Sequence, residues 1–114
     1  MNARRILIIE DEHIVAKALS RALHETGAEI VGMAATVEQA LKLVETIPEF
    51  DGALVDINLR GIWAYSVADA LAGRGVPFVF ATGYGSPIIP DRYRHVPVLQ
   101  KPFEPQEIIA ALFG

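Results

Sequence analysis

Asp56 stands at the end of an apolar run, where a carboxylate is costly unless it has a partner. The run, residues 53–58, is predicted to be a buried strand, and Asp is disfavoured in strands unless it is paired or binds a metal. Glu10 and Asp11 follow a second apolar run, residues 6–9, in the same way. Because the carboxyl ends of parallel strands open onto one crevice, we expect these three side chains to meet there.

Thr82 and Lys101 also follow apolar runs, residues 76–81 and 96–100, and are expected at the same edge. Carboxylates that meet there repel one another, so either their pKa values rise or a cation binds between them. No His or Cys occurs in these motifs, and a ligand set made only of oxygen atoms favours a hard ion such as Mg²⁺.

Once a metal lowers the local charge, Asp56 can act as a nucleophile toward phosphorus and form an aspartyl phosphate. Lys101 can then pair with one phosphoryl oxygen, and the Thr82 hydroxyl can hydrogen-bond another. The chemistry that these residues permit is therefore phosphoryl transfer to the protein itself.

The elements that must position these residues are strands and helices in alternation. The apolar runs are continuous rather than alternating, which is typical of strands covered on both faces. The predicted order is strand 6–9, helix 14–26, strand 29–34, helix 36–47, strand 53–58, a helix through 67–71 that ends at residue 73, strand 76–81, strand 96–100 and helix 105–113. This alternation predicts an α/β fold, a flavodoxin-like doubly wound five-stranded parallel sheet of order 2-1-3-4-5 with helices on both faces.

Three local expectations accompany that fold. In the first helix the apolar positions Ile14, Val15, Ala18, Leu19, Ala22 and Leu23 recur at helical spacing. A loop is expected around Arg60 and Gly61, with Trp63 as a half-buried packing aromatic. A fourth helix between residues 83 and 97 would have to contain Pro87 and Pro90, so this segment is predicted to be a loop or at most one distorted turn.

Length and composition point to one globular domain, residues 1–114. The net charge is −4 and the ten Lys and Arg residues are scattered, which argues against direct binding of nucleic acid. The longest apolar runs are strand-length, so no membrane segment is expected, and a cytoplasmic protein is predicted. We also expect no output domain after the last helix.

The motifs together resemble the receiver domain of two-component response regulators. The resemblance spans the whole chain and is carried by Ile6-Leu7-Ile8-Ile9-Glu10-Asp11-Glu12, by Asp56 and Thr82 at strand ends, and by Lys101-Pro102-Phe103. It implies that Asp56 is the phosphoacceptor. It also implies that the donor is a phosphohistidine on a sensor histidine kinase or a histidine phosphotransfer protein.

The resemblance further assigns the Mg²⁺ ligands. Asp11, Asp56 and the backbone carbonyl of Asn58 would bind the ion directly, and Glu10 would bind it through water. Thr82 and Lys101 would sense the phosphoryl group, and the Lys101–Pro102 peptide would be cis.

Phe80-Ala81-Thr82-Gly83-Tyr84 also resembles the "FAT GUY" receiver subgroup, many of whose members are stand-alone alphaproteobacterial proteins with a reduced or mobile fourth helix. The usual switch aromatic, three residues before the lysine, is Val98 here, so Tyr84 is the expected substitute. We hypothesise that phosphorylation pulls Thr82 inward and orders residues 83–97. Glu10 replaces the commoner Asp, and Arg60 replaces the proline common four residues after the phosphoacceptor.

The expected function is that of a single-domain response regulator, which accepts phosphate on Asp56 and signals by binding an unknown downstream protein or passes the phosphoryl group on in a phosphorelay. It would catalyse only its own phosphorylation and dephosphorylation. One alternative is a small Asp-nucleophile phosphatase, although haloacid-dehalogenase-like sites carry a second acid where this chain has Asn58. The other is a pseudo-receiver, a binding module that is never phosphorylated.

Overall fold

The computed structural model describes residues 3–83 and 89–114. Within them lies one parallel sheet of five strands, in the order β2-β1-β3-β6-β7 that the alternation predicts. Its strands are β1 (Arg5–Ile9), β2 (Glu29–Ala34), β3 (Gly52–Asp56), β6 (Phe78–Thr82) and β7 (Val98–Gln100). The central strand β3 is buried over its whole length, which explains why its sequence shows no alternation.

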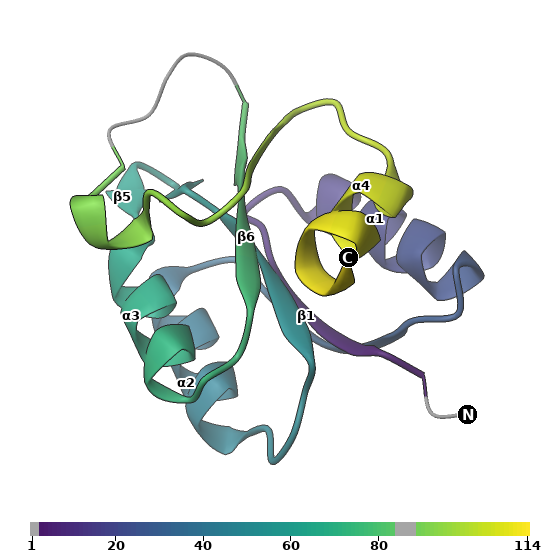
Figure 1. Cartoon of the computed structure of the whole chain (residues 1–114), viewed down its shortest axis with the longest axis horizontal. Coiled ribbons are helices and arrows are strands. Elements are labelled where there is room, and N and C mark those ends of the chain that lie inside the picture. Colours follow the sequence, from purple (N-terminus) through teal and green to yellow (C-terminus); the bar gives the residue numbers. More distant parts are fainter. Residues whose placement is uncertain (1–2, 84–88) are drawn as a thin grey trace.

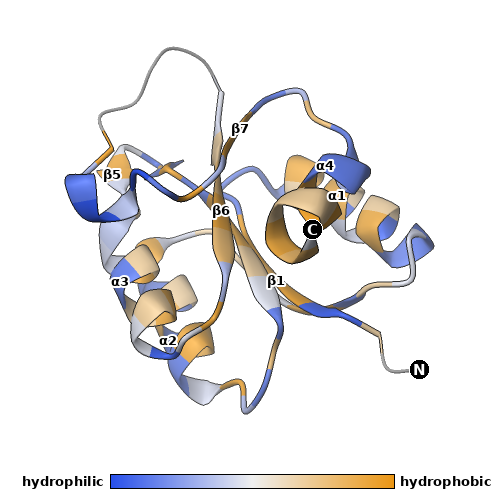
Figure 2. Ribbon diagram, viewed as in Figure 1, coloured by the Kyte–Doolittle hydropathy of each residue, from blue (hydrophilic) through white to orange (hydrophobic). Residues whose placement is uncertain are grey.

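Helices cover both faces of the sheet (Figure 1). They are α1 (His13–Glu25), α2 (Val37–Thr46), α3 (Tyr65–Gly73) and α4 (Pro105–Phe113), with a short 3₁₀ helix η1 (Asp91–Tyr93). In Figure 1, α2 and α3 lie on one side of the strands and α1 and α4 on the other. Apolar residues are concentrated in the strands and on the helix surfaces that face them (Figure 2), giving one core on each face of the sheet.

Local sequence signals set the helix ends. Gly27 has a φ of +99° and follows the end of α1, a backbone conformation that suits glycine. The Thr36 hydroxyl accepts a hydrogen bond from the Gln39 amide at the start of α2, and the Gln39 side chain accepts one from the Ala35 amide. Pro105 is the first residue of α4.

The inward face of α1 does not include all the apolar positions that recur at helical spacing. Ile14 is 83% exposed and Ala18 is also exposed, whereas Ala16 and Leu23 are buried and Leu19 packs against the same core. Residues 16, 19 and 23 keep helical spacing, but that face is rotated from the one that contains Ile14. Ile14 and Ala18 share the helical spacing of the other apolar positions, but their side chains lie on the surface.

The segment after β6 contains no α-helix within residues 89–97, where η1 forms a single turn. The prediction of a short turn is confirmed for this part, while residues 84–88 lie outside the described ranges. Tyr93 is buried and packs edge-on against Phe78 and Phe80. Its hydroxyl donates a hydrogen bond to Asp69 on α3. One turn therefore covers this part of the core.

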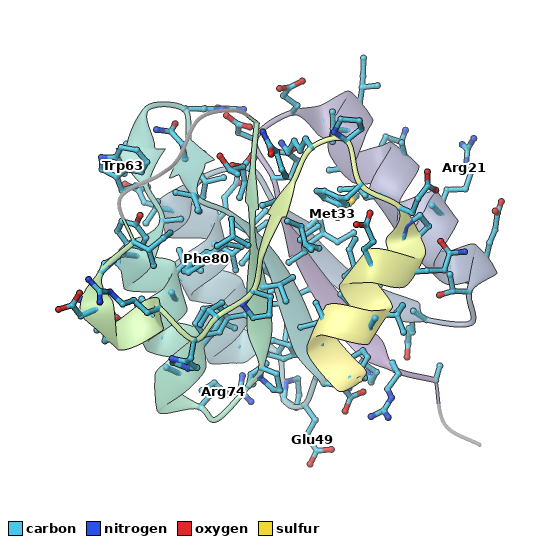
Figure 3. The ribbon with its side chains drawn as sticks, turned by 45° about the horizontal axis from the view of Figure 1, so that its top comes forward. Arg21, Met33, Glu49, Trp63, Arg74 and Phe80 are labelled. Atoms are coloured by element: carbon cyan, nitrogen blue, oxygen red, sulfur yellow. The ribbon has the colours of Figure 1, made fainter. Side chains whose placement is uncertain are left out.

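The connection after β3 is an antiparallel hairpin rather than the expected loop. It consists of β4 (Asn58–Leu59) and β5 (Ile62–Trp63). Arg60 and Gly61 form its two-residue turn, with φ values of +54° and +85°. Trp63 is 54% exposed and stacks on Tyr65, so one face of its ring is packed. In Figure 3, Trp63 lies on the outside of the molecule and Phe80 in the interior.

None of the helices in the described ranges is both long and apolar enough to cross a membrane.

Candidate functional site

The acidic side chains predicted at the sheet edge do meet there. Glu10 follows β1 directly, and Asp56 is the last residue of β3, which pairs with β1. Glu10 is 3% and Asp56 7% exposed, while Asp11 is partly exposed. One carboxylate oxygen from each of the three lies within 4.8 Å of the others. The fold therefore brings three acidic side chains together, two of them buried.

Lys101 supplies the opposing charge. Its ammonium nitrogen lies 2.5 Å from Glu10 Oε1 and 3.0 Å from Asp56 Oδ2. The backbone amide of Lys101 donates to the Thr82 carbonyl at 2.9 Å, so the pairing of β7 with β6 places this lysine. The Lys101–Pro102 peptide is cis, as the resemblance implies.

The proton balance of the site follows from this geometry. Burial, as the largest cause, and the hydrogen bond with Asp56 together raise the pKa of Glu10 to about 8, although Lys101 opposes the shift. Burial lowers the pKa of Lys101, but the hydrogen bonds to Glu10 and Asp56 outweigh this effect and raise it above its usual value. At neutral pH the Glu10 carboxyl therefore holds a proton in most molecules, and Lys101 balances the charge of Asp56.

The donor set fits a divalent cation. Glu10 Oε2 is buried and has no hydrogen-bond partner among the described residues, an arrangement that costs free energy unless an ion or water completes it. Receiver domains generally bind Mg²⁺ through acidic residues, and this cluster offers carboxylate oxygens with no nitrogen or sulfur ligand among its three members. Such a set suits Mg²⁺.

The β4–β5 hairpin contacts two of these acids through its backbone. The Asn58 amide donates to Asp56 Oδ1 at 3.2 Å, and the Arg60 amide donates to Asp11 Oδ2 at 3.0 Å. The Asn58 side chain accepts from the Gly61 amide at 2.7 Å. Sequence reasoning missed these contacts; Gly61, a turn residue soon after Asp56, is the signal that could have indicated the hairpin.

Of the two residues expected to act as a switch, the structure describes Thr82 but not Tyr84. Thr82 ends β6 and is partly exposed, one residue beyond the partner of Asp56 in the strand register. Val98, at the position of the usual switch aromatic, is exposed on β7. Tyr84, the proposed substitute, lies outside the described residues.

The three-dimensional arrangement is shared with solved structures. SdrG from Sphingomonas melonis Fr1 has a solution structure that is 42% identical to this chain and covers 100% of both chains, with a TM-score of 0.84. A structure described as the BeF3-activated conformation of SdrG, from Pseudomonas melonis Fr1, is 44% identical over 96% of this chain and 93% of that one, with a TM-score of 0.76.

Two curated relatives are longer than this chain. The transcriptional regulatory protein PdtaR of Mycobacterium tuberculosis is 30% identical over 113 residues, which is 96% of this chain and 55% of PdtaR. The phyllosphere-induced regulator PhyR of Methylorubrum extorquens is 31% identical over 115 residues, which is 96% of this chain and 42% of PhyR. The chain thus spans about half the length of these relatives.

A family-level comparison covers almost the whole chain. Residues 6–113 match the response regulator receiver domain. The matched range contains the acidic cluster, Thr82 and Lys101, and its fold is the five-stranded parallel sheet described above. The chain therefore belongs to the family of response regulator receiver domains.

Proposed function

We propose that the chain accepts a phosphoryl group on Asp56 from a phosphohistidine of a sensor histidine kinase or a histidine phosphotransfer protein, in a reaction that requires Mg²⁺. The observation that carries this proposal is the position of Asp56, which is nearly buried, paired with Lys101 and within reach of two further acids. The family match and the similarity to SdrG in a BeF3-activated conformation support it.

Asp11, Asp56 and the backbone carbonyl of Asn58 would hold the ion, with Glu10 as a ligand through water. Mg²⁺ would supply positive charge that offsets the repulsion between the Asp56 carboxylate and an incoming phosphoryl group. In the transfer, an Asp56 oxygen forms a bond to phosphorus as the phosphorus–nitrogen bond of the phosphohistidine breaks. The Lys101 ammonium then moves from the Asp56 oxygen to a phosphoryl oxygen, and the Thr82 hydroxyl donates a hydrogen bond to another.

The donor would dock in an apolar groove that begins at the site. The groove has a volume of about 610 Å³, and Lys101 lies both in its wall and in contact with Asp56. Its other lining residues come from α1 and from the start of α4, namely Ile14, Val15, Ala18, Leu19, Ala22, Pro102, Phe103 and Pro105. The exposure of Ile14 fits a surface that is covered when a helix carrying the phosphohistidine binds.

Signalling would then proceed without an external substrate. The phosphorylated chain would bind a downstream protein or return the phosphoryl group to a second histidine in a relay. Residues 80–84 favour the FAT GUY subgroup, with Thr82 and Tyr84 as the switch. Because histidine kinases use ATP, this partnership would place the chain in the cytoplasm.

A phosphatase that acts on external substrates is less well supported. A haloacid-dehalogenase-like enzyme would carry the acid that protonates the leaving group two residues after the nucleophile. Two residues after Asp56 the chain has Asn58, whose side-chain oxygen accepts a hydrogen bond from the Gly61 amide. This side chain closes a turn, and its amide has no acidic proton for a leaving group.

The proposal is tested by the intact mass of the protein after incubation with acetyl phosphate and Mg²⁺. Wild-type protein should gain one phosphoryl group, and the gain should be absent with EDTA and in Asp56→Asn. If acetyl phosphate gives no adduct, the same measurement is made with an autophosphorylated histidine kinase as donor. No adduct from either donor would contradict the proposal and favour a pseudo-receiver.

A further inference from the structure

The β4–β5 hairpin joins the two acids that are proposed to bind Mg²⁺ directly. Its Asn58 amide donates to Asp56 Oδ1, and its Arg60 amide donates to Asp11 Oδ2. Asp56 ends β3, whereas Asp11 lies in the connection from β1 to α1. The hairpin therefore contacts carboxylates that belong to two different segments of the chain.

The contact to Asp11 depends on an uncommon backbone conformation. Arg60 has a φ of +54°, and among the described residues other than glycine it alone has a positive φ. This conformation is unfavourable for a residue with a Cβ atom, and such strain often occurs at functional sites. Here it belongs to the two-residue turn that presents the Arg60 amide to Asp11 at 3.0 Å.

Packing holds the hairpin in place independently of the acids. Leu59 is buried in the core, and the Trp63 ring stacks on Tyr65 with 6.1 Å between ring centroids. The Ala64 amide donates to the Ile57 carbonyl at 2.8 Å and closes the base of the hairpin. A turn that is anchored in this way can impose an orientation on the Asp11 carboxylate.

We propose that the backbone amide of Arg60 is a positioning group for the Mg²⁺ site. By binding Oδ2 of Asp11 it fixes the carboxylate and leaves the other oxygen for the ion. This inference rests on the proposed function, because it concerns the same metal site. Hydrogen bonds to metal ligands from outside the coordination sphere orient those ligands and strengthen metal binding.

The role belongs to the backbone and not to the guanidinium group. A proline, the residue that receiver domains commonly have at this position, could not perform it, because proline has no N–H and its φ is fixed near −65°. The cationic side chain of Arg60 would, if anything, oppose binding of a cation nearby. With Arg60 in place of this proline, the backbone amide can donate its hydrogen bond to Asp11.

The test is the Mg²⁺ dissociation constant, measured by calorimetry for wild-type protein, Arg60→Gly and Arg60→Pro. Both variants lose the cationic side chain, but only glycine keeps the N–H and accepts the positive φ. We expect Arg60→Gly to bind at least as tightly as wild type, and Arg60→Pro to bind about 10–100-fold more weakly. Circular dichroism without Mg²⁺ checks that each variant is folded.

Equal affinity of Arg60→Pro and wild type would overturn the proposal, and so would an equal loss in Arg60→Gly, which would assign the effect to the side chain. If Arg60→Pro does not fold, Arg60→Val takes its place, because it keeps the N–H while disfavouring the positive φ. Wild-type affinity in Arg60→Val would then overturn the proposal. Absence of Mg²⁺ binding by wild-type protein would instead refute the metal site of the proposed function.

Discussion

Replacing Lys101 with methionine should destabilise the metal-free protein and strengthen its response to Mg²⁺. The variant keeps an apolar side chain of similar length but removes the ammonium group 3.0 Å from Asp56 Oδ2. A hydrogen bond to a charged group contributes about 1.5–3 kcal/mol, and removing one partner of a buried ion pair costs about 3–5 kcal/mol.

The two ranges meet at about 3 kcal/mol, which we take as the expected loss of unfolding free energy. Because the pKa of Glu10 is about 8, its carboxyl is mostly neutral at pH 7, so Asp56 alone loses a counter-ion. We therefore expect the free energy of unfolding of Lys101→Met to fall by about 3 kcal/mol at pH 7 in EDTA. Urea unfolding measures this loss. The exposed Lys42 offers the matched control, and Lys42→Met should change stability by less than about 0.5 kcal/mol.

Mg²⁺ should then reverse the loss, because the ion takes over the role of the missing ammonium group. A ligand present at 100 times its dissociation constant stabilises the folded state by about 2.7 kcal/mol. At one fixed Mg²⁺ concentration the gain should be larger in Lys101→Met than in wild type, where Lys101 competes with the ion for Asp56. An unfolding free energy equal to that of wild type, together with an equal Mg²⁺ effect, would refute the reasoning.

Three further predictions follow from the same contacts. The pKa of Glu10 is about 8 in the folded protein and 4.5 as a model value, so the folded state binds the extra proton between these values. The free energy of unfolding without metal should therefore fall as pH rises from about 5 to 8, and the affinity for Mg²⁺ should rise. Urea unfolding and calorimetry across this pH range should show both trends. A Glu10→Gln variant that kept both trends would contradict the assignment to Glu10. Tyr93→Phe removes the hydrogen bond to Asp69 and should lower the free energy of unfolding by about 1 kcal/mol, with an unchanged urea midpoint as the contrary result. Ile14→Asp alters a side chain that is 83% exposed and should slow phosphotransfer from a histidine kinase, while the rate with acetyl phosphate stays constant. Mass measurements at timed intervals would show both rates. An equal effect on both donors would argue against docking in the groove.

Sequence reasoning reached the sheet and the acidic cluster because both follow from simple rules. Continuous apolar runs mark strands that are covered on both faces, and parallel strands bring Glu10 and Asp56 to one edge. Proline content indicated that the segment before β7 would not form a full α-helix, and the described residues 89–97 contain only the single 3₁₀ turn η1. These inferences need only the order and type of residues.

What sequence reasoning missed depends on three-dimensional packing. Strands β4 and β5 have two residues each, too few for any periodicity to be seen, so the hairpin and the Arg60 contact were not predicted. In α1, apolar residues occupy more than one face, and the orientation of the helix on the sheet decides that Ile14 is exposed. Whether the Glu10 carboxyl is protonated or is paired as an anion with Lys101 depends on its burial and on its distance from Lys101. No sequence pattern encodes either quantity.

The most direct test of the central claim is to locate the phosphoryl group on the chain. Protein incubated with acetyl phosphate and Mg²⁺, or with the phosphorylated kinase, is treated with borohydride, which reduces an acyl phosphate to an alcohol, and its peptides are sequenced by mass spectrometry. The account predicts homoserine at position 56 and unmodified residues at Glu10 and Asp11. Modification at either of those acids with Asp56 intact, or no reduced residue anywhere, would contradict it.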